Sequence, residues 1–317
     1  MKLPNAKAVI DLIVPVFNES NRMVVHIEEM IQTVREAGYT PHVILVDDGS
    51  RDDTWSVIED LSTRYMEIEG VRLSRNFGKD DAIFTGFNYA RGEAAITIDS
   101  DGQHPISMLP EMLYAWEKGQ LIVHAVKAER SDESVGIQLR AKLFNYCMSK
   151  LMGTNMQGAS DYKLLDKRIV EILRQHGTTN AIYRFLVSGM GFPSAALPMN
   201  TLPSTRPSRW QLASLFQLAT RAIMFHTDVP LKAFVIMVLL IMGLTIGLLT
   251  ILLITLMYGN VVSGYSTLLV LSLLNLCITV VGITGVAVYL KGTLDIVAGR
   301  SGAIVWQHTS IKTELPK

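Results

Sequence analysis

Cysteine, net charge and glycine-rich phosphate loops are scarce or missing in this 317-residue sequence. Its two cysteines are too few for a disulfide framework and suit a reducing compartment. Basic and acidic residues both number 29, which disfavours a nucleic-acid partner held by bulk charge. Neither a G-x-G-x-x-G motif after the first apolar run nor a G-x-x-x-x-G-K-[ST] motif occurs. Dinucleotide oxidoreductases and P-loop nucleoside triphosphatases are therefore disfavoured.

Charged residues are also missing from one long stretch near the C-terminus. No aspartate, glutamate, lysine, arginine or histidine occurs between Ala233 and Leu290. As a helix, residues 234–257 would extend ~36 Å at ~1.5 Å per residue, enough to cross a hydrocarbon core of ~30 Å. A break at 258–264 separates them from a second apolar segment, 266–290. The pattern predicts two transmembrane helices, and a buried hairpin inside a soluble protein is the alternative.

Positive charges flank the two predicted spans on one side only. Lys232 precedes the first span, Lys291 and Arg300 follow the second, and the connecting loop has no lysine or arginine. Because positively charged flanks stay in the cytosol, both termini and the large N-terminal region are expected there. The sequence thus predicts a multi-pass membrane protein whose soluble part is cytosolic.

The N-terminal region does contain a regular alternation of short apolar runs and segments in which apolar residues recur at helical spacing. This alternation favours an α/β domain with a mostly parallel sheet and right-handed crossovers. The expected strands are approximately 10–17, 42–47, 71–73, 94–99 and 121–126. The expected helices are approximately 20–37, 53–65, 79–90, 109–118 and 185–190, with a further one beginning near residue 135.

Polar side chains follow three of these strands at the point where each strand ends. They are Asn18 and Glu19, Asp47 and Asp48, and Asp99 and Asp101. Because open α/β sheets bind ligands outside the carboxyl ends of their strands, we expect the three pairs to line one pocket. Asp99 and Asp101 offer hard oxygen ligands, which suit Mg²⁺ or Mn²⁺ shared with a substrate phosphate. The alternative for this pair is an acidic turn that caps the following helix.

Several short motifs, in a fixed order, carry a resemblance to a known family. They are Pro15-Val-Phe-Asn18-Glu19, Val46-Asp-Asp48-Gly-Ser50, Ser74-Arg-Asn-Phe-Gly-Lys79 and Asp99-Ser-Asp-Gly-Gln-His-Pro105, followed by Gly158–Asp166 and Tyr183-Arg184-Phe185. With the two apolar segments they make the chain similar to family 2 of the glycosyltransferases. Within that family it resembles the polyprenyl-phosphate sugar transferases, which include dolichyl-phosphate mannose synthase and the bacterial bactoprenol glucosyltransferases.

The resemblance implies an α/β domain of the GT-A type, Rossmann-like, that binds a nucleotide-sugar. Four residues at matching positions would hold the base and ribose: Pro15, Asn18, Glu19 and Asp48. Asn76 and Lys79 would form another part of the donor site, with a solvated turn as the alternative. Asp99 and Asp101 would hold Mg²⁺ or Mn²⁺ on the donor diphosphate, with Gln103 close by.

The catalytic candidates are Asp101, Asp161 and Arg184. The resemblance places Asp161 at the sugar and acceptor end of the cleft, where it would orient the acceptor or a sugar hydroxyl. Its alternative role is a helix cap or a salt-bridge partner of Lys163 or Arg184. Arg184 would contact the phosphate of either the donor or the acceptor.

The acceptor phosphate is assigned to three arginines, Arg130, Arg206 and Arg209. An amphipathic stretch at 206–231 precedes the first apolar segment and is expected to lie in the lipid headgroup layer. There a guanidinium pairs well with a lipid phosphate, and ordinary attraction to anionic lipid is the alternative. The local pattern departs from the family, because Arg206 stands where a glycine is usual.

Four regions and one reaction are predicted. The regions are a catalytic domain at 1–205, the amphipathic region at 206–231, a transmembrane hairpin at 232–291 and a cytosolic tail at 292–317. The reaction moves one sugar, with glucose from UDP-glucose as the first guess, to undecaprenyl or another polyprenyl phosphate at the bacterial inner membrane by inverting displacement. The alternatives are a processive polysaccharide synthase and a non-catalytic nucleotide-binding adaptor, and a homo-oligomer is compatible with a small membrane anchor.

Overall fold

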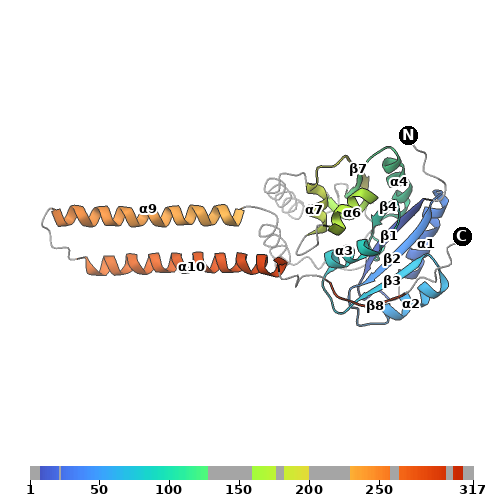
Figure 1. Ribbon diagram of the computed structural model, residues 1–317, viewed down its shortest axis with the longest axis horizontal. Helices are drawn as coiled ribbons and strands as arrows, with labels where there is room; N and C mark the ends of the chain where they lie inside the picture. Colours follow the sequence, from blue (N-terminus) through green and yellow to red (C-terminus); the bar gives the residue numbers. More distant parts are fainter. Residues whose placement is uncertain are drawn as a thin grey trace, which may run out of the picture. The chain divides into compact units, whose positions relative to one another are not determined.

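The computed structural model describes residues 8–20, 23–127, 159–175, 182–199, 229–257, 264–297 and 303–309 (Figure 1). The chain divides into two compact units. The first comprises the N-terminal part up to Trp210 together with the segment from Ser301 onward, and the second comprises residues 211–300. The predicted α/β class is confirmed in the first unit.

One sheet organises the first unit, and its described strands lie in the order β7-β5-β6-β4-β1-β2-β3-β8. Their bounds are β1 Val9–Val16, β2 Thr40–Asp47, β3 Ile68–Leu73, β4 Ala94–Thr97, β5 Ile122–Lys127, β6 Ala159–Asp166, β7 Ser194–Met199 and β8 Val305–His308. The strands β4, β1, β2 and β3 are parallel neighbours, whereas β6 and β8 are antiparallel to the strands they pair with. The sheet is therefore mixed, which corrects the expectation of a mostly parallel sheet at these two strands.

Helices cover both faces of this sheet (Figure 1). On one face lie α1 (Met23–Glu36), α2 (Thr54–Arg64), the short 3-10 helix η1 (Ile106–Met108) and α4 (Leu109–Glu117). On the other lie α3 (Lys79–Tyr89), α6 (Lys167–Gln175) and α7 (Tyr183–Gly189). In β1, Leu12 and Val14 pack into the first core and Ile13 into the second, because successive side chains of a strand point to opposite faces. A strand buried on both faces explains the unbroken apolar run in the sequence.

The predicted strands and helices are confirmed over β1 to β5, α1 to α4 and α7. The helix predicted from about residue 135 lies outside the described residues. The strands β6, β7 and β8 and the helix α6 were missed. Polar residues such as Asp161 and Lys163 interrupt the apolar run of β6, and β8 is only four residues long. Through β8, the predicted separate tail contributes an edge strand to the sheet.

The second unit contains two long helices, α9 (Val229–Met257) and α10 (Tyr265–Val297). They pack on each other, with Nδ2 of Asn275 lying 3.4 Å from Oγ1 of Thr245 and Gly282 lying against Met237. Many of their large apolar side chains are exposed. Of the helices in the described residues, none is both long and apolar enough to span a membrane.

Candidate functional site

The polar residues that follow β1, β2 and β4 share one edge of the sheet, as the sequence predicted. These three strands are parallel, and β1 lies between the other two. The residues after each strand therefore project from the same edge, where ligands of α/β proteins bind. The structure adds residues from α3, β6, α7 and β8 to this edge.

A cluster of four charged side chains lies beside β4. The Lys79 ammonium at the start of α3 donates hydrogen bonds to Asp99 and Asp161, at 2.8 Å in both cases. Arg184 in α7 holds Asp161 from the other side, with Nε 3.1 Å from Oδ1 and Nη2 3.0 Å from Oδ2. The structure thus brings Asp99, Asp161, Lys79 and Arg184 together, and the four predicted site residues form one ion-paired group.

The charge of Asp161 is fixed by its two cationic neighbours. Its side chain is mostly buried, and burial alone would raise the pKa of its carboxyl. Lys79 and Arg184 outweigh that effect and hold the pKa of Asp161 well below its ordinary value. The carboxylate is therefore ionised at neutral pH, and its low basicity makes it a better orienting group than a general base. Of its two suggested salt-bridge partners, Arg184 is confirmed. Lys163 instead lies with Nζ 2.9 Å from Nδ1 of His124.

The turn after β4 presents the two predicted metal ligands. Asp101 is exposed, and its Oδ1 accepts a hydrogen bond from the backbone N–H of Gln103 at 3.0 Å. His104 is buried and shapes the turn, since its Nδ1 accepts the backbone N–H of Asp99 at 3.2 Å. Burial lowers the pKa of His104, so the ring stays neutral and can accept this bond.

The donor set at this turn fits a divalent cation that a substrate helps to bind. No group of three or more histidine, cysteine, aspartate or glutamate side chains suited to a metal occurs in the described residues. Mg²⁺ is usually held by one or two carboxylates and completed by substrate phosphates and water. Asp99 and Asp101 meet that requirement, and a cation bound there would compete with Lys79 for Asp99.

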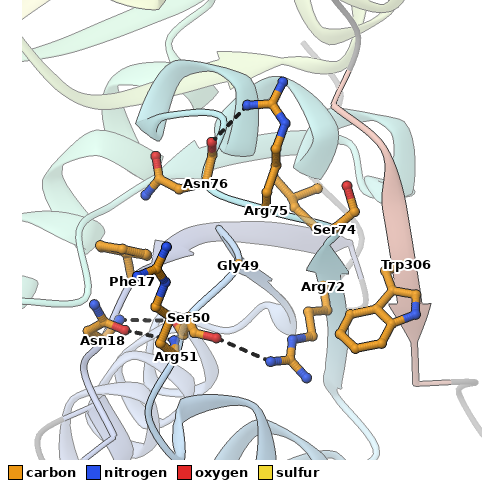
Figure 2. A pocket seen from close by; sticks show the side chains of 11 residues that line it. Phe17, Asn18, Gly49, Ser50, Arg51, Arg72, Ser74, Arg75, Asn76 and Trp306 are labelled. Atoms are coloured by element: carbon orange, nitrogen blue, oxygen red, sulfur yellow. Dashed lines mark hydrogen bonds between the residues drawn. The ribbon is translucent and has the colours of Figure 1, made fainter.

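A pocket of about 440 Å³ opens at the same edge of the sheet, over β1, β2 and β3 (Figure 2). This volume lies within the range of small-molecule sites, ~300–1,000 Å³. Its lining residues are polar, cationic or aromatic for the most part: Phe17, Asn18, Gly49, Ser50, Arg51, Arg72, Leu73, Ser74, Arg75, Asn76 and Trp306. Of the predicted donor residues, Asn18 and Asn76 line this pocket. The expectation that all three strand-end pairs line one pocket is corrected, because Asn18 is the one of those six residues among its lining residues.

Asn18 shapes one wall through its backbone and its amide. Its φ of 54° is unusual for a residue other than glycine, although asparagine tolerates it better than most. The backbone N–H donates to Oγ of Ser50 at 3.0 Å, and Oδ1 accepts the backbone N–H of Arg51 at 3.0 Å. The turn after β1 is thereby tied to the turn after β2.

Asp48 connects the pocket with the charge cluster. Its carboxylate accepts the backbone N–H groups of Phe77 at 2.7 Å and Gly78 at 3.0 Å. That loop follows Asn76 in the pocket and leads directly into Lys79 in the cluster. Asp48, predicted to hold the base or ribose, thus positions the loop that joins the two halves of the site.

The remaining predicted donor residues are Pro15, Glu19 and Gln103. Pro15 lies within β1 opposite Val46, and the backbone N–H of Glu19 donates to Oγ1 of Thr54 at 3.0 Å. Their roles in donor binding, like that of Gln103, stay predictions. The three acceptor candidates Arg130, Arg206 and Arg209 lie outside the described residues.

Sequence reasoning missed the arginines and aromatic residues of the pocket. Arg72 stands one residue before the end of β3, and a charge inside a buried strand could have drawn attention to it. Phe17 and Arg75 lie inside the quoted motifs without having been given a role. Trp306 had no such pattern around it, because it lies in a short segment at the far end of the chain.

Comparison with known proteins places the chain in a family. The model of glycosyl transferase family 2 matches residues 11–185. An uncharacterized glycosyltransferase of Synechocystis is 27% identical over 70% of this chain and 71% of its own length. A prophage bactoprenol glucosyl transferase homolog of Escherichia coli is 27% identical over 90% of this chain and 94% of its own.

One further relative agrees with this placement. The bactoprenol glucosyl transferase of Shigella phage SfV is 27% identical over 82% of this chain and 86% of its own. Among solved structures, glucosyl-3-phosphoglycerate synthase of Mycobacterium tuberculosis aligns at 17% identity with a TM-score of 0.47, covering 68% of this chain and 79% of that one. The family match covers more than half of the chain, and the mixed α/β sheet is in keeping with the expected GT-A type. The chain belongs to glycosyl transferase family 2, and it is a glycosyltransferase.

Proposed function

We propose that this enzyme transfers one sugar from a nucleotide-sugar to a polyprenyl phosphate at the cytosolic face of the bacterial inner membrane. Relatives named bactoprenol glucosyl transferase, which align over most of their length, support the lipid acceptor. By the same likeness the donor is a nucleotide-sugar, with UDP-glucose as the first one to test.

The observation that carries the proposal is the ion-paired cluster of Lys79, Asp99, Asp161 and Arg184 beside a pocket large enough for a nucleotide. Sugar transfer between two phosphates builds up negative charge on the leaving diphosphate and starts from a negative acceptor. Two fixed cations held by two carboxylates supply charge compensation that is already oriented before the reaction. The loop held by Asp48 spans the distance from nucleotide to reacting phosphate.

The acceptor chemistry removes the need for a strong base. The second pKa of a phosphate monoester is ~6, so its attacking oxygen is already ionised at neutral pH. A new bond then forms between this oxygen and the anomeric carbon while the bond from that carbon to the donor diphosphate breaks, which inverts the anomeric centre. Asp161, with its depressed pKa, positions Lys79 and Arg184 or a sugar hydroxyl in this step.

Asp99 and Asp101 are the residues that would hold Mg²⁺ or Mn²⁺. Such an ion, when bound, neutralises charge on the donor diphosphate. The Lys79 ammonium is paired with Asp99, so the protein itself also supplies a positive charge beside this carboxylate. This arrangement predicts that metal and Lys79 both affect donor binding.

None of the described helices is long and apolar enough to span a membrane, but the sequence has no charged residue between Ala233 and Leu290. On that sequence evidence we propose that the segments 234–257 and 266–290 lie in the membrane. Arg130, Arg206 and Arg209 are our candidates for holding the acceptor phosphate. Arg209→Ala should raise the KM for polyprenyl phosphate at least several-fold and leave the KM for the donor unchanged. An unchanged acceptor KM would leave Arg209 as a general lipid contact. Extraction of the protein from membranes by carbonate alone would contradict the anchor.

The deciding experiment is transfer by membranes that contain the full chain, given polyprenyl phosphate and a panel of labelled UDP- and GDP-sugars. Mass spectrometry of the lipid should show one added sugar, whereas a retained polymer would favour a processive synthase.

Asp101→Asn should lower the rate of transfer on the order of 100-fold or more, as removal of one transition-state contact does elsewhere. Asp60→Asn, which removes an exposed carboxylate paired with Arg64 on α2, is the matched control and should stay active. Full activity of Asp101→Asn or in excess chelator would refute the metal role, and no lipid product from any donor would refute the function.

A further inference from the structure

The strand β8 reaches the donor pocket from the far end of the chain. It pairs with β3, and three contacts made by side chains of β8 and of the residue after it hold it there. Oε1 of Gln307 accepts a hydrogen bond from Nη1 of Arg72 at 3.0 Å, Nε2 of His308 lies 2.6 Å from Oε1 of Glu69, and Oγ1 of Thr309 accepts the backbone N–H of Gly70 at 2.7 Å. The edge strand is thus fixed by side chains as well as by its backbone.

A shift in strand register sets Trp306 apart from its neighbours. Val305 pairs with Leu73 and Gln307 with Arg72, so that Trp306 has no partner residue in β3. An extra residue of this kind bends the strand and redirects a side chain, and it is common beside active sites. Here the redirected side chain is an indole that lines the pocket (Figure 2).

Arg72 holds this indole in place. Its guanidinium carbon lies 5.0 Å from the centre of the Trp306 ring and 5.7 Å from that of Trp55. Its Nε is 3.2 Å from Oδ2 of the buried Asp47, and its Nη2 donates to the carbonyl oxygen of Ser50 at 3.2 Å. Held by this ion pair and this hydrogen bond, Arg72 serves as a rigid support for Trp306.

The ring that Arg72 supports is nevertheless exposed. Trp306 keeps 63% of its surface accessible, while the guanidinium below it is mostly buried. A single exposed apolar residue is ordinary on a protein surface. An exposed indole that is fixed by a cation and turned toward a pocket is a surface on which a flat aromatic ring stacks.

We propose that Trp306 is a donor-binding residue, on whose indole the base of the nucleotide stacks. The segment that follows the paired helices in sequence therefore completes the donor site. This inference rests on the proposed function, because it takes the occupant of the pocket to be a nucleotide. Its base is the part of the ligand that Trp306 contacts, and its phosphates extend toward Lys79 along the loop held by Asp48.

The test measures binding to the full-length protein by titration calorimetry, with UDP, GDP and inorganic pyrophosphate as probes in the presence of Mg²⁺. For whichever nucleotide binds the wild-type protein, Trp306→Ala should lower the affinity roughly 5- to 150-fold. This is the range expected for one base stacked on one aromatic ring. Trp306→Phe should stay within about three-fold of the wild type, because it keeps a ring for stacking. Pyrophosphate has no base, so its affinity should be the same in all three proteins.

Ile304→Ala is the matched control, since it removes an apolar side chain of similar exposure, 62%, that does not line the pocket. It should bind nucleotide like the wild type. Equal nucleotide affinity of Trp306→Ala and wild type would overturn the inference, as would an equal loss for pyrophosphate, which would indicate a damaged pocket. Failure of the wild-type protein to bind either nucleotide would instead overturn the proposed function itself.

Discussion

Replacing His42 by glutamine should remove a pH-dependent part of the stability of the catalytic unit. His42 is buried on β2 between two carboxylates, with Nδ1 2.6 Å from Oδ1 of Asp11 and Nε2 3.0 Å from Oε2 of Glu69. Both carboxylates are almost fully buried. Arg91 and His308 also contact Glu69, and Asp11 accepts the backbone N–H of Arg91. The network joins β1, β2, β3 and β8, the strands beneath the pocket.

The size of the effect follows from the pKa of His42. Burial alone lowers this pKa, but hydrogen bonds and charge from Asp11 and Glu69 outweigh burial and raise it to about 9, from an ordinary value of 6.5. A difference of ~2.5 units at ~1.36 kcal/mol per unit gives on the order of 3 kcal/mol. Because the folded-state pKa is the higher one, this stability is fully present below pH ~6.5 and is lost as the pH rises through about 9.

Urea unfolding of the wild type and His42→Gln at several pH values between 6 and 10, in the same detergent throughout, measures this contribution. The free energy of unfolding of the wild type minus that of the variant should fall by about 3 kcal/mol across the range. His26→Gln, on α1 outside the network, is the control for the exchange of imidazole for amide. A difference between wild type and His42→Gln that stays constant from pH 6 to pH 10 would refute the reasoning.

Two further predictions concern the site itself. Asp161→Asn leaves Lys79 and Arg184 without their shared carboxylate. The substitution should lower the free energy of unfolding, measured with urea, by about 1–3 kcal/mol. This is below the range for fully buried pairs because both cations are partly exposed. It should also lower kcat at least 100-fold. A variant that unfolds like the wild type and keeps its kcat would contradict this. Gly49→Ala should weaken UDP binding at least 10-fold, because at its φ of 67° a Cβ would lie 2.4 Å from the backbone of Arg75. Gly38→Ala, at φ 87° with open space around it, separates backbone strain from this clash, and equal UDP affinity of both variants would argue against a role for the contact.

The sequence by itself determined the α/β class, most strands and helices, and the edge of the sheet that carries the site. Short apolar runs predict strands that are buried on both faces, and Asn18, Asp48 and Asp99 follow the ends of these strands within two residues. Local patterns suffice here because the position of a residue relative to the end of its own strand does not depend on the order of the strands in the sheet. The order of the motifs also sufficed to indicate the family.

The tertiary structure decided how those residues combine. Lys79 pairs with Asp99, 20 residues away, and with Asp161, 82 residues away, and no local pattern encodes such contacts. Trp306 reaches the pocket only because β8 pairs with β3 and a shift in register redirects its side chain. Short strands such as β8 owe their conformation to a neighbouring strand, since hydrogen bonds across the sheet, and not local propensity, stabilise them. Which side chains meet at the site therefore depends on the order of the strands, and this order is established only when the whole sheet folds.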